Sequence, residues 1–223
     1  MTGATMVIAG ATGLVGAAAV EVALSRGWKV VALVRKGRNL SPRAGLTVLE
    51  CDFDALAASR DAVISHQPSA FLCALGTTIR TAGSQAAFAR VDLEYVKAFA
   101  DLGIACGAKG FGLVSSVGAS ASSSNFYLRT KGEAEQAVRA SGYGHVEIAR
   151  PSFLVGERAE HRPGEKLAVP VATILSPLLV AGLAIYRPIE AGTVARALVA
   201  ALEKPESGAF VRHYGELVAL ART

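Results

Sequence analysis

Three residues have the types and the spacing that proton transfer requires: Ser116, Tyr127 and Lys131. A tyrosine and a lysine four residues apart on a helix share one face. A tyrosine hydroxyl can give a proton to the alkoxide that forms when hydride reduces a carbonyl, and a lysine beside it supplies a positive field that favours tyrosinate. Ser116 would donate a hydrogen bond to the carbonyl oxygen and fix its place. The alternative is that these residues have no role in chemistry: Tyr127 would be an ordinary half-buried aromatic, Lys131 a surface charge and Ser116 a hydroxyl at the end of a strand.

The glycines of "GATGLVG" have a spacing typical of a phosphate-binding turn. They follow a short apolar run, residues 6–9, and precede helix-forming residues up to Arg26. Gly10 can take the tight turn, Gly13 lets the backbone approach a pyrophosphate, and Gly16 lets the helix pack closely on the strand. Free N–H groups at the helix start would face the phosphate oxygens. A glycine-rich turn without a ligand is the alternative.

Strand and helix patterns alternate over the first 150 residues. Apolar runs predict strands at 28–34, 46–52, 69–76, 110–116 and 144–151. The clearest helical pattern is an apolar stripe formed by Phe88, Val91, Tyr95, Phe99 and Leu102. A second helix is predicted over 126–140, with Ser124 or Asn125 as N-cap. This alternation predicts an α/β fold with a doubly wound, mostly parallel sheet and a ligand crevice at the carboxyl ends of the strands.

The length of 223 residues suits a single domain that spans residues 1–223. The part from about 151 to 223 contains proline-punctuated segments, a helical pattern at 190–204 and a short strand near Phe210. We expect this part to cap the crevice and close over a substrate.

The composition excludes several classes of protein. The net charge is +5, but the basic residues are scattered and are not interleaved with aromatics, so no nucleic-acid partner is expected. Cys51, Cys73 and Cys106 form no CxxC pair and have no histidines at ligand spacing, which predicts a reducing environment and no metal site. The N-terminal residues lack the pattern of a signal peptide. We therefore expect a cytoplasmic protein.

The uncharged stretch at residues 167–186 is long enough to be considered as a membrane span. Pro170 and Pro177 interrupt it, and polar sequence with helix and strand signals follows. We expect no membrane span here, but a helix pair that is buried or faces a second copy in a homodimer.

Taken in their order along the chain, these features resemble the short-chain dehydrogenase/reductase superfamily, whose members have an NAD(P)-binding Rossmann fold. The closer resemblance is to its atypical branch, related to the Tat-interacting-protein oxidoreductases. It is carried by "GATGLVG", "CALGTT", "FARVDLEYV", "SSVGASASSSNFYLRTKGEAE", "RPSFLVGER" and "RPGE", which cover most of residues 5–167. The resemblance implies catalytic roles for Ser116, Tyr127 and Lys131, and a bond from Lys131 to the nicotinamide ribose.

The motifs and the resemblance together imply a set of cofactor-binding residues. They are Gly10, Thr12, Gly13, Leu14, Val15, Gly16, Arg35, Lys36, Asp52, Phe53, Leu75, Gly76, Thr77, Lys131 and Pro151. Asp52 resembles the family's adenine contact and equally suits a helix N-cap. Gly76 and Thr77 would lie where the backbone passes the nicotinamide ribose, although a Gly-Thr-Thr turn needs no ligand. Arg150 lies near the expected pocket or pairs with surface carboxylates, and Cys73 is expected to be a buried thiol.

The end of the second predicted strand favours one dinucleotide. An NAD-selective site has an acidic residue there, which accepts hydrogen bonds from the adenosine ribose. Asp and Glu are absent from residues 22–49, and Arg35 is the first residue after the apolar run. A guanidinium can hold a 2′-phosphate by paired hydrogen bonds, and Lys36 would add to the positive field. We therefore expect NADP(H) to be preferred over NAD(H); a solvated basic loop is the alternative.

These features predict an NADP(H)-dependent oxidoreductase that transfers hydride to or from a small carbonyl or alcohol substrate. The alternative is an NADP(H)-binding redox-sensing or regulatory protein with little or no catalysis, because the resembled group includes members regarded as regulators. The intact Ser116, Tyr127 and Lys131 favour the enzyme, since a pure sensor needs no proton donor.

Overall fold

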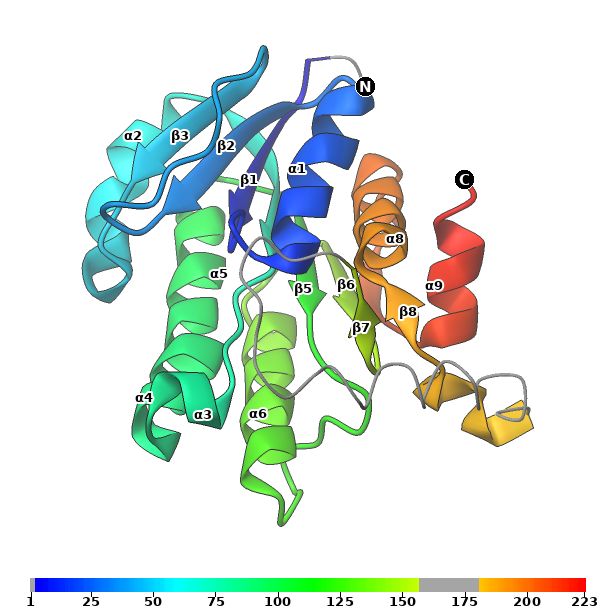
Figure 1. Cartoon of the computed structure of the whole chain (residues 1–223). Coiled ribbons are helices and arrows are strands. Elements are labelled where there is room, and N and C mark those ends of the chain that lie inside the picture. Colours follow the sequence, from blue (N-terminus) through cyan, green and yellow to red (C-terminus); the bar gives the residue numbers. More distant parts are fainter. Residues whose placement is uncertain (1–2, 157–180) are drawn as a thin grey trace.

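A seven-stranded parallel sheet runs through the centre of the molecule, with helices on both faces (Figure 1). The computed structural model describes residues 3–156 and 181–223. The strands lie in the order β3-β2-β1-β4-β5-β6-β9, and every pair of neighbours is parallel. They are β1 (Thr5–Ala9), β2 (Lys29–Val34), β3 (Leu46–Glu50), β4 (Pro68–Cys73), β5 (Gly110–Val114), β6 (His145–Ala149) and β9 (Gly208–Arg212). A separate parallel pair consists of β7 (Leu154–Val155) and β8 (Ile189–Glu190).

The helices form two layers. The first covers one face of the sheet and contains α1 (Leu14–Ser25), α8 (Ala191–Glu203) and α9 (Tyr214–Leu220). The second covers the other face and contains η1 (Phe53–Ser59), α2 (Arg60–Ile64), α5 (Tyr95–Ala105) and α6 (Phe126–Ala140). Shorter helices are α3 (Ile79–Ala82), α4 (Gln85–Ala89), the π-helical turn η2 (Arg90–Glu94) and η4 (Ala181–Tyr186).

Each central strand contributes side chains to both hydrophobic cores. On β1, Met6 and Ile8 pack in the cluster under α1 and α8, whereas Val7 and Ala9 pack in the cluster under α5 and α6. Because successive side chains of a strand point to opposite faces, a strand covered on both sides must be apolar throughout. This explains the uninterrupted apolar runs and confirms the predicted doubly wound α/β fold.

Several predicted elements appear where expected. The helix predicted over 126–140 is α6, and Asn125 rather than Ser124 caps it, with its Oδ1 accepting from the Leu128 amide at 3.1 Å. The strand expected near Phe210 is β9. The apolar stripe from Phe88 to Leu102 is not one helix, because α4, η2 and α5 follow one another across it.

The C-terminal part completes the sheet rather than forming a separate layer above it. Strand β9 pairs with β6 in parallel, and α8 packs against α1 and the sheet. Residues 157–180 lie outside the described residues. The capping role expected for about 151–223 therefore stays a prediction.

The uncharged stretch at 167–186 lies mostly outside the described residues. Its last part, Ala181–Tyr186, is the 3-10 helix η4, on which Leu183 and Tyr186 are exposed. Among the described residues, no helix is both long enough and apolar enough to cross a membrane.

The only tryptophan of the chain, Trp28, joins the two longest elements of the first helical layer. It lies just before β2, at the amino edge of the sheet, and only 3% of its surface is exposed. Its Nε1 donates to Glu203 of α8 at 3.2 Å, and Arg26 at the end of α1 pairs with the same carboxylate at 2.7 Å. The ends of α1 and α8 are thereby tied together.

Candidate active site

The carboxyl edge of the sheet places most of the predicted site residues in a row. Because all strands are parallel, the residues that follow them meet at one edge, in the strand order Asp52, Arg35, Gly10, Gly76 and Ser116. β2 and β5 are three strand spacings apart, which is about 14 Å. The edge is thus long enough for an extended dinucleotide, and chain order reverses between β1 and β4, where such folds bind their ligands.

The glycine turn between β1 and α1 has no room for a side chain at Gly10 or at Gly16. Gly10 has φ +81°, and a Cβ there would overlap the backbone of Ala74 after β4. A Cβ at Gly16 would overlap the carbonyl of Gly10, so α1 can lie this close to the turn only with glycine. Gly13 is the N-cap, without a side-chain cap, and the first turn of α1 contains no acidic residue. These features fit an anion at the helix start.

A buried ion pair lies under the turn that follows β4. The Lys131 ammonium of α6 is 2.8 Å from Oδ1 of Asp92 on η2, and the other oxygen of Asp92 accepts from the Thr77 amide at 2.9 Å. A Cβ at Gly76 would stand 3.5 Å from Oδ1 and 3.7 Å from Nζ, so the glycine lies directly against the pair. The structure therefore brings together Gly76, Thr77 and Lys131, three of the predicted residues.

The electrostatics of Lys131 follow from this geometry. Burial is the largest single influence on the pKa of Lys131 and lowers it, but the Asp92 carboxylate and the side chain of Tyr127 together outweigh it, and the net result is a raised pKa. Lys131 is therefore a cation at neutral pH although only 7% of its surface is exposed.

Tyr127 lies one helical turn before Lys131 and is half-buried. Its ring packs against Phe88 of α4, with 5.5 Å between the ring centroids. The loop from β5 reaches α6 closely, because the Ser120 amide donates to the Leu128 carbonyl at 3.1 Å. A Cβ at Gly132 would overlap the backbone of this loop at Ser120 and Ala121, so the approach depends on glycine.

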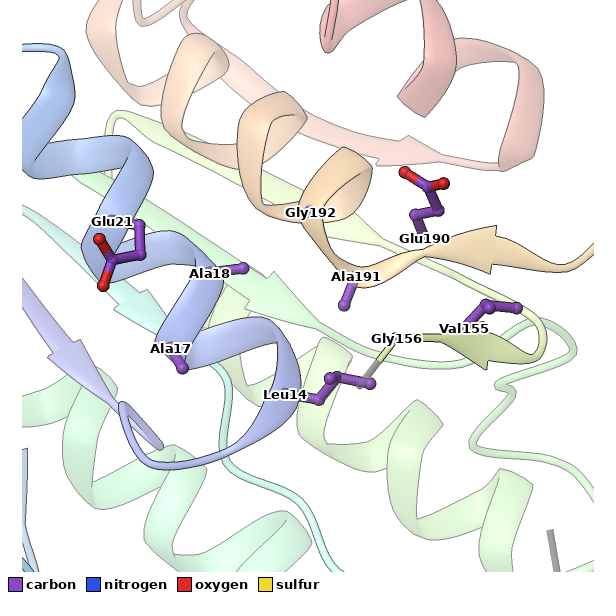
Figure 2. A pocket seen from close by; sticks show the side chains of 9 residues that line it. All are labelled: Leu14, Ala17, Ala18, Glu21, Val155, Gly156, Glu190, Ala191 and Gly192. Atoms are coloured by element: carbon purple, nitrogen blue, oxygen red, sulfur yellow. The ribbon is translucent and has the colours of Figure 1, made fainter. Parts of the chain in front are cut away.

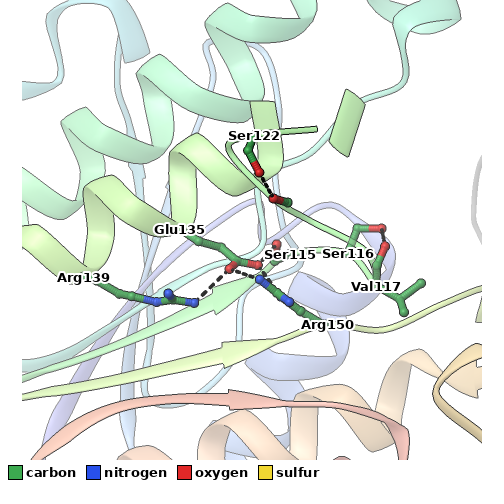
Figure 3. Close-up of polar contacts among 8 residues, drawn as sticks. Ser115, Ser116, Val117, Ser122, Glu135, Arg139 and Arg150 are labelled. Carbon is green, nitrogen blue, oxygen red and sulfur yellow. Dashed lines mark hydrogen bonds and ion pairs between the residues drawn. The ribbon is translucent and has the colours of Figure 1, made fainter. Parts of the chain in front are cut away.

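A second buried carboxylate, Glu135, joins α6 to the ends of β5 and β6 (Figure 3). It accepts from the Ser115 hydroxyl at 2.6 Å and from Arg150 in a bidentate pair at 2.8 and 2.6 Å. Arg139 adds a contact of 3.0 Å. The pKa of Arg150 is raised, first by its hydrogen bond to Glu135. Arg150 thus pairs with a buried carboxylate and not with a surface one.

Ser116, the predicted catalytic serine, follows directly after this network. Its hydroxyl is half-buried and donates to the Val117 carbonyl at 3.3 Å. The Val117 amide in turn donates to the Pro151 carbonyl at 2.9 Å, which holds the loop against the end of β6. Pro151 is itself buried, so its side chain belongs to the support of the site.

The residues expected to contact the adenosine end of the cofactor differ in exposure and in their contacts. Arg35 and Lys36 are exposed just after β2. Asp52 is exposed and caps η1, accepting from the Asp54 amide at 2.9 Å, which confirms the N-cap alternative. Phe53 is 5% exposed and packs against Tyr95 at 5.6 Å between centroids, so only its backbone is available to a ligand.

The remaining predicted cofactor residues also differ in exposure. Val15 is buried in the first core, Leu75 packs against the second, and Thr12 is exposed in the glycine turn. Cys73 is fully buried at the end of β4, and burial raises its pKa to about 12, as expected for an inert thiol.

A pocket of about 400 Å³ opens beside the glycine turn, between the start of α1 and the start of α8 (Figure 2). Small and apolar residues line it, with the carboxylates of Glu21 and Glu190 among them. Leu14 is the one predicted cofactor residue in its lining. The pocket is therefore separate from the cluster formed by Gly76, Asp92 and Lys131.

Two site residues were not predicted from the sequence, Asp92 and Glu135. Asp92 is one of two acidic residues in "FARVDLEYV" and stands four residues after Phe88, on the side of the apolar stripe, and a carboxylate at a core-facing position is a signal that could have been used. Glu135 lies four residues after Lys131, on the face that Tyr127 and Lys131 share.

The fold is that of known NAD-binding proteins. WbmH of Bordetella bronchiseptica, solved in complex with NAD+, aligns with a TM-score of 0.72 over 96% of this chain and 76% of that chain. UDP-glucose 4-epimerase of Thermotoga maritima, solved with UDP-glucose, aligns with a TM-score of 0.71 over 98% of this chain and 81% of that chain. Both are 17% identical, so the likeness shows the fold, which is Rossmann-like.

The chain belongs to the NAD dependent epimerase/dehydratase family, whose pattern matches residues 6–215. Protein HTATIP2 of Rattus norvegicus is 40% identical over 157 residues, which is 70% of this chain and 62% of the relative. The chain thus spans less than two thirds of that relative's length. Protein FMP52, mitochondrial, of Candida albicans is 33% identical over 208 residues, 90% of this chain and 89% of the relative. The predicted resemblance to the atypical, Tat-interacting-protein-like branch is confirmed.

One expectation from the sequence is wrong on this comparison. The chain was expected to be cytoplasmic, but several relatives, among them those of Candida albicans and Emericella nidulans, are named mitochondrial. The absence of a signal-peptide pattern does not distinguish between compartments inside the cell.

Proposed function

We propose that the protein is an NADP(H)-dependent oxidoreductase that transfers hydride to or from a small carbonyl or alcohol substrate, with Tyr127 as the acid and base. The observation that carries this proposal is the cluster at the end of β4. There Gly76, Thr77 and the buried cation Lys131 meet, one helical turn from Tyr127. A structural helix would not need a lysine and an aspartate buried together at the ligand-binding edge of the sheet.

Each residue has a distinct part in this proposal. The uncapped start of α1 and the glycine turn would hold the pyrophosphate, and bound NADP(H) supplies or accepts the hydride. Lys131 would orient the nicotinamide ribose and place a positive charge near Tyr127. Tyr127 would give its proton to the developing alkoxide, and Ser116 would hold the carbonyl oxygen.

The preference for NADP(H) rests on the end of β2. Arg35 is exposed there, and the described structure contains no hydrogen bond or ion pair of its side chain that a 2′-phosphate would have to break. The position lies beside the glycine turn, because β1 and β2 are neighbours in the sheet. WbmH and WbmG of Bordetella bronchiseptica, which are similar in fold, are solved with NAD, so the proposed preference rests on this chain's own residues alone.

Oxidation of NADPH in the presence of aldehydes, ketones, quinones and flavins tests the proposed function. Turnover with at least one class is expected, and Tyr127→Phe should abolish most of it. Cofactor binding without turnover of any class would contradict the enzyme and favour the redox-sensing or regulatory alternative. Failure to bind either dinucleotide would contradict both.

A further inference from the structure

We propose that Asp92 is a positioning residue of the candidate active site, which keeps the Lys131 ammonium charged and fixed at the end of β4. This inference rests on the proposed function, because it concerns the lysine that would contact the cofactor.

The geometry gives Asp92 two contacts that together fix the site. The carboxylate is fully buried, with 0% of its surface exposed. Oδ1 lies 2.8 Å from Lys131 Nζ and has no other partner in the described part of the chain, whereas Oδ2 accepts from the Thr77 amide at 2.9 Å. One side chain therefore links α6, η2 and the turn after β4.

The local backbone explains how a carboxylate reaches this place. Phe88 of α4 is buried against Phe126 and Tyr127, Val96 of α5 packs in the second core, and the π-helical turn η2 lies between α4 and α5. A π-turn holds an extra residue relative to an α-helix, so it changes which side chain points inward. Burying a carboxylate costs several kcal/mol unless it is paired. Asp92 is therefore stabilised at this position by the lysine opposite it.

The other groups around Lys131 cannot replace this counter-charge. Tyr127 on α6 and Cys73 on β4 are the other titratable groups that act on it. The thiol of Cys73 stays neutral because burial raises its pKa to about 12. Without Asp92, the group that raises the pKa of Lys131 most is lost, and burial, which lowers the pKa of a lysine, is opposed less.

The test compares Asp92→Asn with the wild-type protein between about pH 6 and about pH 9, the range into which an unpaired buried lysine can shift. Two quantities are measured: the free energy of unfolding in denaturant, and the dissociation constant of NADPH by calorimetry. Asp54→Asn is the matched control, since Asp54 is an exposed carboxylate that pairs with Arg90 of the same π-turn.

The two deficits of Asp92→Asn should change in opposite directions. The loss of stability should be largest at low pH, where the unpaired lysine is charged. As pH rises, the unfolding constant of Asp92→Asn relative to the wild type should fall at least about tenfold, because the unfolded state then binds more protons than the folded state. The loss of NADPH affinity should instead grow with pH, because the lysine becomes neutral. Asp54→Asn should show neither trend.

Other outcomes overturn the proposal. Deficits that are the same at every pH would show a purely structural role. A pH trend in stability with a constant loss of affinity would show that Asp92 assists folding but does not position Lys131 for the cofactor. If the wild type binds neither NADPH nor NADH, the proposed function fails, and the stability trend still decides whether Asp92 keeps Lys131 charged.

A second variant covers the case in which Asp92→Asn does not fold. Asp92→Asn combined with Lys131→Met removes both buried charges. This double variant should fold and show no pH trend in stability relative to wild type. If it is no more stable than Asp92→Asn alone, the cost does not come from an unpaired lysine, and the proposal is wrong.

Discussion

Lys131 acts in this structure as half of a buried pair, and this changes what its charge can do. A lone lysine would place a full positive charge beside Tyr127, whereas the Asp92 carboxylate at 2.8 Å compensates part of that field. In the proposed mechanism, the contribution of Lys131 would then lie as much in holding a ligand hydroxyl in place as in its electrostatic effect on the tyrosine. The proposed proton transfer would depend correspondingly more on the hydroxyl of Tyr127 itself.

Tyr127→Phe should keep NADPH binding and reduce turnover by about a hundredfold or more, the usual scale of a general-acid contribution. The ring and its contact with Phe88 remain, so the loss reports on the hydroxyl alone. Steady-state rates and calorimetric affinity measure the two effects. Tyr143→Phe is the control, because its hydroxyl bonds to the Ala100 carbonyl in the second helical layer. Equal activity of wild type and Tyr127→Phe would remove this residue from the mechanism.

Arg35→Asp should erase or invert the preference for NADPH, which we expect to be at least about tenfold, or 1.4 kcal/mol, over NADH in the wild type. The substitution removes the guanidinium and introduces a charge that repels a 2′-phosphate and accepts from ribose hydroxyls. Calorimetry with both dinucleotides measures the ratio. Arg222→Asp, at the exposed C-terminal end, makes the same change in net charge and should leave the ratio unaltered. Equal binding of both dinucleotides by the wild type would contradict the role of Arg35.

At the scale of elements, the position of α6 depends on how closely the β5–α6 loop can approach it. Gly132 allows this approach, and Glu135 one turn later clamps the helix to the ends of β5 and β6 through Ser115 and Arg150. The face of α6 that carries the proposed catalytic residues is therefore held from both sides, by a backbone contact and by a buried polar network.

Gly132→Ala should destabilise the protein by about 1–3 kcal/mol, the usual cost of forcing extra volume into a packed site. A methyl group there would overlap the loop backbone at Ser120 and Ala121, and the same loop bonds to Ser116 through the Ala119 amide. Gly215→Ala in α9 is the control, since a Cβ there meets nothing within 4 Å. Because alanine favours helix over glycine, the control should be neutral or slightly stabilising. Denaturant unfolding distinguishes the two; equal effects would show that the loop tolerates displacement.

The sequence predicted those elements whose signals lie within the element itself or directly beside it. The strands and α6 were predictable because apolar runs and the Asn125 cap are local features. The interruption at η2 was not, since an apolar stripe continues in sequence across a π-turn. The partners of Lys131 and Arg150 were also missed, because Asp92 and Glu135 reach them only through contacts between elements distant in sequence.

At the scale of the whole molecule, the two cores share one sheet. β9 comes from the C-terminal part, yet it pairs with β6, and α8 packs on α1 near the other end of the chain. The first and last parts of the sequence therefore stabilise the same layer, which favours a single cooperative unit.

Unfolding should accordingly give one transition. Trp28 fluorescence reports on the first helical layer, whereas far-ultraviolet circular dichroism reports on all helices and strands. The two midpoints should coincide within error, since neither core can lose the shared sheet alone. Two separate transitions would show that the parts before and after residue 151 fold independently.

The place of Trp28 also allows the binding of a reduced cofactor to be followed by fluorescence. The indole lies at the amino edge, whereas the proposed cofactor would lie across the carboxyl edge, about 20 Å away along the six residues of β2. Reduced nicotinamide absorbs where tryptophan emits, and the chain contains no second indole to confuse the signal. Energy transfer from Trp28 to a bound dihydronicotinamide would thus read out occupancy of the crevice from a residue that never touches it.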